Sequence, residues 1–220
     1  NESNVDLNRN FLRHPDEHVA NPDYDLLYDA VNPDRLDADS EAVRLAALLD
    51  FAAAHGGPRL QAALSRGQYV HPRGVQFGGS CEEDANRIVR GIVRRDTRGA
   101  RRVVWLDLHT GLGPWGACEL VSQHALDDPA YVTGRAWFGD CVRSTRSGDS
   151  VSALLVGDML DGAPLELDRD CEVVAFAPEF GTWDMNRVFL AMRADNWLQH
   201  HGDPESEQGR VIKRELLEVF

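Results

Sequence analysis

Apolar positions along the chain alternate between helical spacing and short continuous runs. Over residues 40–55 they fall on one face of a helix, which we expect to begin at the N-cap Ser40 and to end at Gly56. Residues 80–97 show similar spacing. This stretch begins with Ser80–Glu83, a capping box whose two side chains would each satisfy a free backbone N–H. Both stretches therefore predict amphipathic helices.

Two apolar runs rich in β-branched residues predict strands. They are VVWLDLH, residues 103–109, and CEVVAFAPEFG, residues 171–181, and both suit buried parallel strands better than surface helices. Helical spacing returns over residues 183–202 and again over 204–220, where Pro204 suits the first turn. This alternation of helical and strand patterns is typical of an α/β layered fold.

The remaining sequence and the bulk composition predict a single soluble domain, residues 1–220. Residues 56–79 and 125–150 are rich in glycine, proline and polar residues and predict loops along one rim. Apolar residues make up 43% of the chain and charged residues 27%, as in globular proteins. The net charge of −13 disfavours nucleic acid and anionic membranes as partners, and the sequence leaves the oligomeric state open.

The cysteines and the N-terminal sequence bear on location. Cys81, Cys118, Cys141 and Cys171 are well separated and form no C-x-x-C pair, so we expect buried thiols in a reducing compartment. The polar start is no signal peptide, which favours a cytoplasmic location. The chain does not begin with Met and starts in sequence that resembles the middle of a domain, so we also expect a preceding segment, which could carry a targeting signal.

Candidate chemistry begins where the first predicted strand ends. His109 closes that strand, and strand alternation places Asp107 on the same face. The Asp107 carboxylate can then accept one ring N–H and leave the other nitrogen for a metal or a proton. Ligands of open α/β sheets bind at such strand ends. The alternative is a histidine that Asp107 satisfies and that has only a structural role.

Two further sets of side chains are candidates for an active site that includes His109. Glu179 ends the second predicted strand between Pro178 and Phe180, where partial desolvation would raise the pKa of a carboxyl towards that of a general base. The alternative is a glutamate turned into solvent. Asn8 and Arg9 stand side by side as flat donors suited to a carboxylate, or they belong to an ordinary polar loop.

The phrases NVDLNRNF, DLHTGLG and PEFGT, in this order, resemble the zinc carboxypeptidase superfamily, which includes aspartoacylase and succinylglutamate desuccinylase. GQY, residues 67–69, FGG, residues 77–79, and LHTGLGPWG resemble a bacterial branch of it known mainly as an uncharacterised domain. The likeness covers nearly the whole chain. It implies a mixed, largely parallel sheet with helices on both faces, incomplete at the N-terminus, that holds one zinc ion.

The resemblance also implies a reaction, the hydrolysis of an amide bond by zinc-activated water, as in metallocarboxypeptidases or acylamino-acid deacylases. His109 would be a zinc ligand, with Asp107 behind it. Glu179 would take the proton of the water and pass it to the leaving amine. Asn8 and Arg9 would bind the terminal carboxylate of a small peptide or an acylated amino acid.

The chain also departs from the pattern of this superfamily. Its members carry a His-x-x-Glu pair of zinc ligands and a catalytic arginine upstream of the Asn-Arg pair, and this chain has neither. We expect those residues in a preceding segment. The alternative is a metal-free binding or scaffold domain of the same fold. Tyr69 and Tyr131 are the available counterparts of the mobile tyrosine of the superfamily, and no motif supports either.

A local metal site is a third hypothesis. Residues 14–18, HPDEH, fit the H-x-x-E-H spacing of inverted zinc proteases, so that His14, Glu17 and His18 could bind a metal by themselves. Pro15 restricts any helix there to its start, which favours a solvated loop instead.

Overall fold

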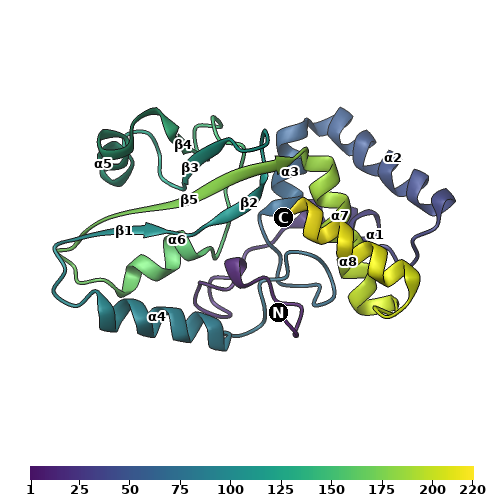
Figure 1. The fold of residues 1–220 in the computed structure, drawn as a ribbon, viewed down its shortest axis with the longest axis horizontal. Helices are drawn as coiled ribbons and strands as arrows, with labels where there is room; N and C mark the ends of the chain where they lie inside the picture. The colour runs from purple at the N-terminus through teal and green to yellow at the C-terminus, as the bar shows by residue number, and fades with distance from the viewer.

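The computed structural model describes residues 1–220 and has an open five-stranded sheet at its centre (Figure 1). The long strand β5 (Glu172–Trp183) organises this sheet. It pairs in parallel with β1 (Arg102–Leu106) along its first half and with β2 (His109–Leu112) along its second. On its other edge it pairs antiparallel with β3 (Cys118–Ser122), which pairs in parallel with β4 (Val142–Ser144). The predicted mixed, largely parallel sheet is confirmed.

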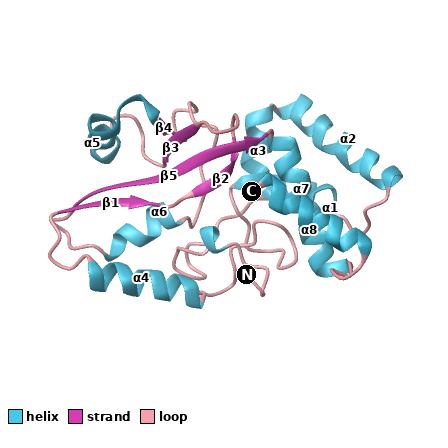
Figure 2. Ribbon diagram, viewed as in Figure 1, coloured by secondary structure: helices cyan, strands magenta, loops and turns pink.

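Eight α-helices and three short 3-10 helices surround the sheet (Figure 2). In this view α5 lies above the sheet, α4 and α6 lie below it, and the other α-helices gather beyond the end of β5. None of the helices combines the length and the apolar character needed to cross a membrane. The helices are α1 (Pro22–Val31), α2 (Ala38–His55), α3 (Gly57–Ser65), α4 (Asp84–Asp96), α5 (Pro129–Phe138), α6 (Met159–Gly162), α7 (Met185–His201), α8 (Glu207–Val219), η1 (Leu7–Arg9), η2 (Gly139–Cys141) and η3 (Ala163–Glu166).

The helix predicted over 40–55 is confirmed as α2, with a different first residue. Asp37 is the N-cap, and its carboxylate accepts a hydrogen bond from the Ser40 backbone N–H, so Ser40 as N-cap was wrong. An aspartate three residues upstream competes for the same role, because either side chain can bond a free N–H of the first turn. Gly56 ends the helix with φ of 90°, a conformation that glycine adopts at low cost.

The starts of two other predicted helices were also wrong. For α4 the capping box does not form: the helix begins at Asp84, and the Asn10 side chain accepts the hydrogen bond from the Glu83 N–H. A distant residue thus replaces the local cap. In α8 the first turn begins after Ser206, whose hydroxyl accepts from Gly209, so Pro204 lies before the helix.

Both predicted strands exist, but the first is divided. β1 ends at Leu106 and β2 begins at His109, so that Asp107 and Leu108 form a break between two partners of β5. β5 extends two residues beyond the predicted run, to Trp183.

The two segments predicted as loops contain regular structure, which corrects that prediction. α3 lies within residues 56–79, where Ala63 joins a buried cluster with Leu48 and Phe51 of α2. α5 and β4 lie within residues 125–150, where Tyr131 and Val142 pack against β5. Both segments are polar on average, and tertiary packing of a few apolar side chains decides their structure.

The cysteines also depart from the expectation of buried thiols. Cys81, Cys118 and Cys141 are exposed and Cys171 is partly exposed, and all four are free. Each of the four lies at or just beyond the edge of an element, where a small apolar side chain need not point into the core.

Gly157 permits a close approach between the N-terminal segment and the chain before α6. Its φ is 73°, and a Cβ there would lie 2.4 Å from the carbonyl oxygen of Arg9. We expect Gly157→Ala to lower the free energy of unfolding by at least about 1 kcal/mol more than Gly148→Ala does, measured by urea denaturation. Gly148 has φ of 77° with open space around it, so it carries the same backbone strain without the clash. Equal losses in the two variants would contradict this close-packing argument.

Candidate active site

Asn8, Asp107 and His109 form one hydrogen-bonded group where β1 ends and β2 begins. Asp107 Oδ2 lies 2.8 Å from His109 Nε2, and Asn8 Nδ2 lies 3.0 Å from the same carboxylate oxygen and 3.1 Å from the ring nitrogen. The hydrogen bond with Asp107, opposed by burial, raises the pKa of His109. The ring nitrogen Nε2 is thus engaged, while Nδ1 has no protein partner.

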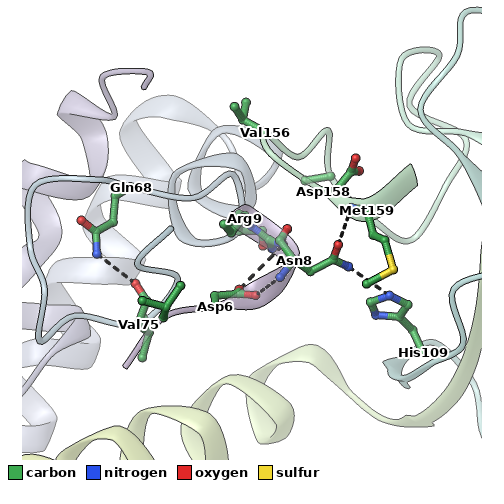
Figure 3. Close-up of polar contacts among 12 residues, drawn as sticks. Asp6, Asn8, Arg9, Gln68, Val75, His109, Val156, Asp158 and Met159 are labelled. Carbon is green, nitrogen blue, oxygen red and sulfur yellow. Dashed lines mark hydrogen bonds and ion pairs between the residues drawn. The ribbon is translucent and has the colours of Figure 1, made fainter. Parts of the chain in front are cut away.

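Asn8 makes two further hydrogen bonds, one through its backbone and one through its side-chain oxygen. In η1 the Asp6 carboxylate accepts a hydrogen bond from the Asn8 backbone N–H at 2.9 Å. The Asn8 side-chain oxygen accepts from the Met159 backbone N–H at 2.7 Å, as Figure 3 shows. One amide therefore links the N-terminal segment, the β1–β2 break and the start of α6.

Glu179 lies beside His109 because the two residues are in register on the parallel strands β2 and β5. The residue is 8% exposed, and its Oε1 accepts a hydrogen bond from the Leu112 backbone N–H at 3.0 Å. Burial raises the pKa of this carboxyl, and the Leu112 N–H partly opposes the rise. A buried carboxyl with a raised pKa next to a histidine has the properties of a general base.

Arg9 is buried beside this group, and two of its three guanidinium nitrogens donate to backbone carbonyls. Its Nε donates to the Ser65 carbonyl at 2.9 Å and one terminal nitrogen donates to the Asn8 carbonyl at 2.7 Å. The other terminal nitrogen, Nη2, has no protein partner. The structure therefore brings Asn8, Asp107, His109 and Glu179 together, and leaves one free donor of Arg9 at their side.

Two charged residues that we did not predict complete this face of the sheet. Glu119 is directly opposite Glu179 on β3, so His109, Glu179 and Glu119 form a row across three strands. A cavity of about 200 Å³ opens beside Glu179, and Glu119 and Arg143 also line it. No local motif marks Glu119 or Arg143, because their place depends on the pairing of β3 with β4 and β5.

The donor set fits part of a zinc site. The free Nδ1 of His109 is a suitable zinc ligand, and the Asp107 carboxylate behind the ring is the usual support of such a ligand. Residues 1–220 contain no group of three histidine, cysteine, aspartate or glutamate side chains that could hold a metal ion. The chain therefore offers one ligand, and a complete zinc centre requires further ligands.

Residues 14–18 do not assemble a local metal site. His14 Nδ1 and His18 Nε2 hydrogen bond to each other at 2.8 Å, while the Glu17 carboxylate turns away to bond Arg13. The third hypothesis, three ligands from this motif, is therefore wrong for this structure. The Glu17 carboxylate pairs with the Arg13 guanidinium rather than facing the two rings.

Neither candidate tyrosine is free to move as a catalytic group would. The Tyr69 hydroxyl donates to the Arg9 carbonyl at 2.8 Å, and its ring stacks on His18. Tyr131 is buried against Val142 and Phe176. Both side chains are held by packing or by hydrogen bonds.

Asp158, next to Met159, is a buried carboxyl whose stability contribution depends on pH. It is 1% exposed, accepts hydrogen bonds from Gln123 Nε2 at 2.6 Å and from the Asp161 N–H at 3.0 Å, and caps α6. Burial raises its pKa to about 6 from 3.8. Between these values the unfolded chain releases a proton that the folded chain keeps, so stability falls as the pH rises.

We expect this carboxyl to cost the folded chain about 3 kcal/mol between pH 4 and pH 7, relative to Asp158→Asn. The measurement is the free energy of urea unfolding of both proteins across this range. Other groups titrate equally in the two proteins, so the difference between them isolates Asp158. A difference that stays constant with pH would show that the pKa of Asp158 is not raised.

Comparisons with known proteins identify a family for this chain. A family model with the description "Protein of unknown function (DUF2817)" matches residues 1–220. No curated protein and no solved structure matches the chain.

Proposed function

The chain belongs to the DUF2817 family, and we propose that it supplies the catalytic face of a zinc-dependent hydrolase of amide bonds. The reaction would be metallocarboxypeptidase-like or acylamino-acid deacylase-like, and the proposal includes kinship with the zinc carboxypeptidase superfamily. Its main support is the register that sets Glu179, buried and with a raised pKa, beside His109. A pairing of a general base with a candidate ligand on neighbouring parallel strands is what such a reaction needs.

In this proposal each residue has one task. His109 would bind zinc through Nδ1, while its Nε2–H donates to Asp107 and Asn8 donates to the same carboxylate. Zinc, when bound, activates a water and polarises a carbonyl. Glu179 would accept the proton of the attacking water and donate it to the nitrogen of the leaving amine. The free Nη2 of Arg9 would bind a substrate carboxylate, while Asn8 holds the Asp107 carboxylate beside the His109 ring.

The substrate and location belong to the same proposal. The free donor of Arg9 favours a small peptide or an acylated amino acid with a free carboxylate near the scissile amide. A cytoplasmic location is supported by four unpaired cysteines, three of them exposed, since such thiols persist in a reducing compartment.

A second candidate function is a binding or scaffold domain without catalysis. The observation that favours it is the hydrogen bond that Asp107 already makes with the His109 ring, as it would for a structural histidine. The two functions predict different metal contents of the protein, because only the enzyme binds zinc. They also differ in the sequence before Asn1, where the enzyme requires a His-x-x-Glu pair.

The test is the zinc content of the full gene product, measured by mass spectrometry of the metal. We expect about one zinc per chain, and a loss of at least tenfold in His109→Ala, because losing a ligand exceeds the roughly 10–100-fold effect of losing a supporting residue. His55→Ala, a change in an exposed histidine of α2, is the matched control. Zinc that survives His109→Ala, or a full gene product without zinc, would rule out this site.

A further inference from the structure

Cys118 and Cys141 lie close together on neighbouring elements of the sheet. Cys118 is the first residue of β3, and Cys141 is the last residue of η2, directly before β4. The parallel register of the two strands pairs Leu120 with Val142. Continued one residue back, this register brings Cys141 level with Glu119, so Cys118 is its diagonal neighbour. The Cα atoms of such neighbours are about 6 Å apart, within the range that a disulfide spans.

Both thiols are on the side of the sheet where α5 lies (Figure 1). Cys118 and Leu120 are two residues apart on β3, so their side chains share a face. Leu120 packs against the buried cluster that contains Tyr131 of α5. The Cys141 thiol donates a hydrogen bond at 3.1 Å to the carbonyl of Phe138, the last residue of α5. The two side chains therefore meet on one face, as a bond between them requires.

The two cysteines can be reached by a small reagent from solvent. Both are exposed and both are free. Both also line the cavity of about 200 Å³ that Glu179 lines. Partial burial, followed by the proximity of Cys141, raises the pKa of the Cys118 thiol, which agrees with a short distance between the two groups. The pair therefore combines proximity with access, the two conditions for thiol–disulfide exchange.

We infer that Cys118 and Cys141 are a modification site at which a low-molecular-weight disulfide oxidises the two thiols to one reversible disulfide bond. One thiolate attacks a sulfur of the reagent, which forms a mixed disulfide and releases one reagent thiolate. The other thiolate attacks the protein sulfur of this mixed disulfide, so the Cys118–Cys141 bond forms and the second reagent thiolate leaves. The cysteines lose two electrons and the reagent gains them. The new bond joins β3 to the start of β4 in the wall of the candidate active-site cavity.

The experiment is oxidation of the full gene product with oxidised glutathione, followed by alkylation of the remaining thiols, tryptic digestion and mass spectrometry without reduction. Trypsin separates the two cysteines, because Cys118 lies in the peptide 103–135 and Cys141 in the peptide 136–143. We expect these two peptides to be linked, at least about tenfold more abundantly than any other pair, because neighbouring thiols react at a high effective concentration. Dithiothreitol should release the two peptides again.

Cys118→Ser should remove the linked pair and leave Cys141 as a mixed disulfide with glutathione. Cys171→Ser is the matched control and should keep the linked pair, because Cys171 precedes the far end of β5, roughly 30 Å from Cys118 at the rise of a strand. Absence of the linked pair, whether the two thiols carry glutathione or stay free, would overturn the inference. So would a linked pair found only in a covalent dimer on a non-reducing gel. The readout needs no turnover, so its outcome is independent of the proposed hydrolysis.

Discussion

Glu179→Gln is expected to lower kcat for amide hydrolysis by about 10²–10⁴-fold in the full gene product, the usual effect of losing a general base. The glutamine keeps the shape of the side chain, and its amide oxygen can still accept the Leu112 N–H. Its amide cannot take the proton of the attacking water. The loss should therefore appear in kcat, with the folded structure retained.

The measurement is the release of free amine from a panel of dipeptides and N-acyl amino acids, followed on the best substrate. Glu172→Gln is the matched control, because Glu172 lies on the same strand but is exposed and paired with Arg102. The control should retain full activity. Equal activity of Glu179→Gln and the unchanged protein would show that Glu179 is not the base.

Arg193→Ala is expected to lower the free energy of unfolding by about 3–5 kcal/mol, the cost of removing one member of a buried ion pair. Arg193, on α7, is 1% exposed. Its Nε donates to the carbonyls of Ala30 and Val31 at 3.0 and 3.1 Å, at the end of α1, and its terminal nitrogens bind the Glu41 carboxylate of α2. The alanine would leave two helix-terminal carbonyls and one carboxylate without their partner.

Urea denaturation of the two proteins measures this loss. Arg169→Ala, an exposed arginine in a loop, controls for the removal of a positive charge and should leave the unfolding midpoint unchanged. Arg193→Lys should be intermediate, because an ammonium keeps the charge but cannot span both the carbonyls and the carboxylate. A loss below about 1 kcal/mol in Arg193→Ala would show that α1, α2 and α7 are held together mainly by apolar packing.

These two variants report on separate parts of the molecule. Arg193 joins the helices beyond the end of β5, and Glu179 lies on the sheet face that carries the candidate chemistry. A stability loss confined to Arg193→Ala and an activity loss confined to Glu179→Gln would show that the helical group supports the fold without taking part in the reaction.

The sequence by itself determined that His109 and Glu179 belong to strand-forming apolar runs. Side chains alternate along a strand with a period of two, which predicted that Asp107 and His109 share a face, and their side chains do hydrogen bond. The sequence did not determine where the strands end, because β1 stops at Leu106 and β5 continues to Trp183. Gly56 ended α2 for an equally local reason, because only its own backbone conformation was involved.

Only the tertiary structure decided which distant residues reach this group. Asn8 comes from the N-terminal segment and Met159 from α6, and the bonds between them and the β1–β2 break depend on packing, which no local pattern encodes. Arg143 joins the face through the register of β4 on β3. The wrong start of α4 has the same cause, since Asn10 caps this helix from far along the chain. Local periodicity fixes the face a side chain takes, and long-range pairing fixes the neighbours it meets there.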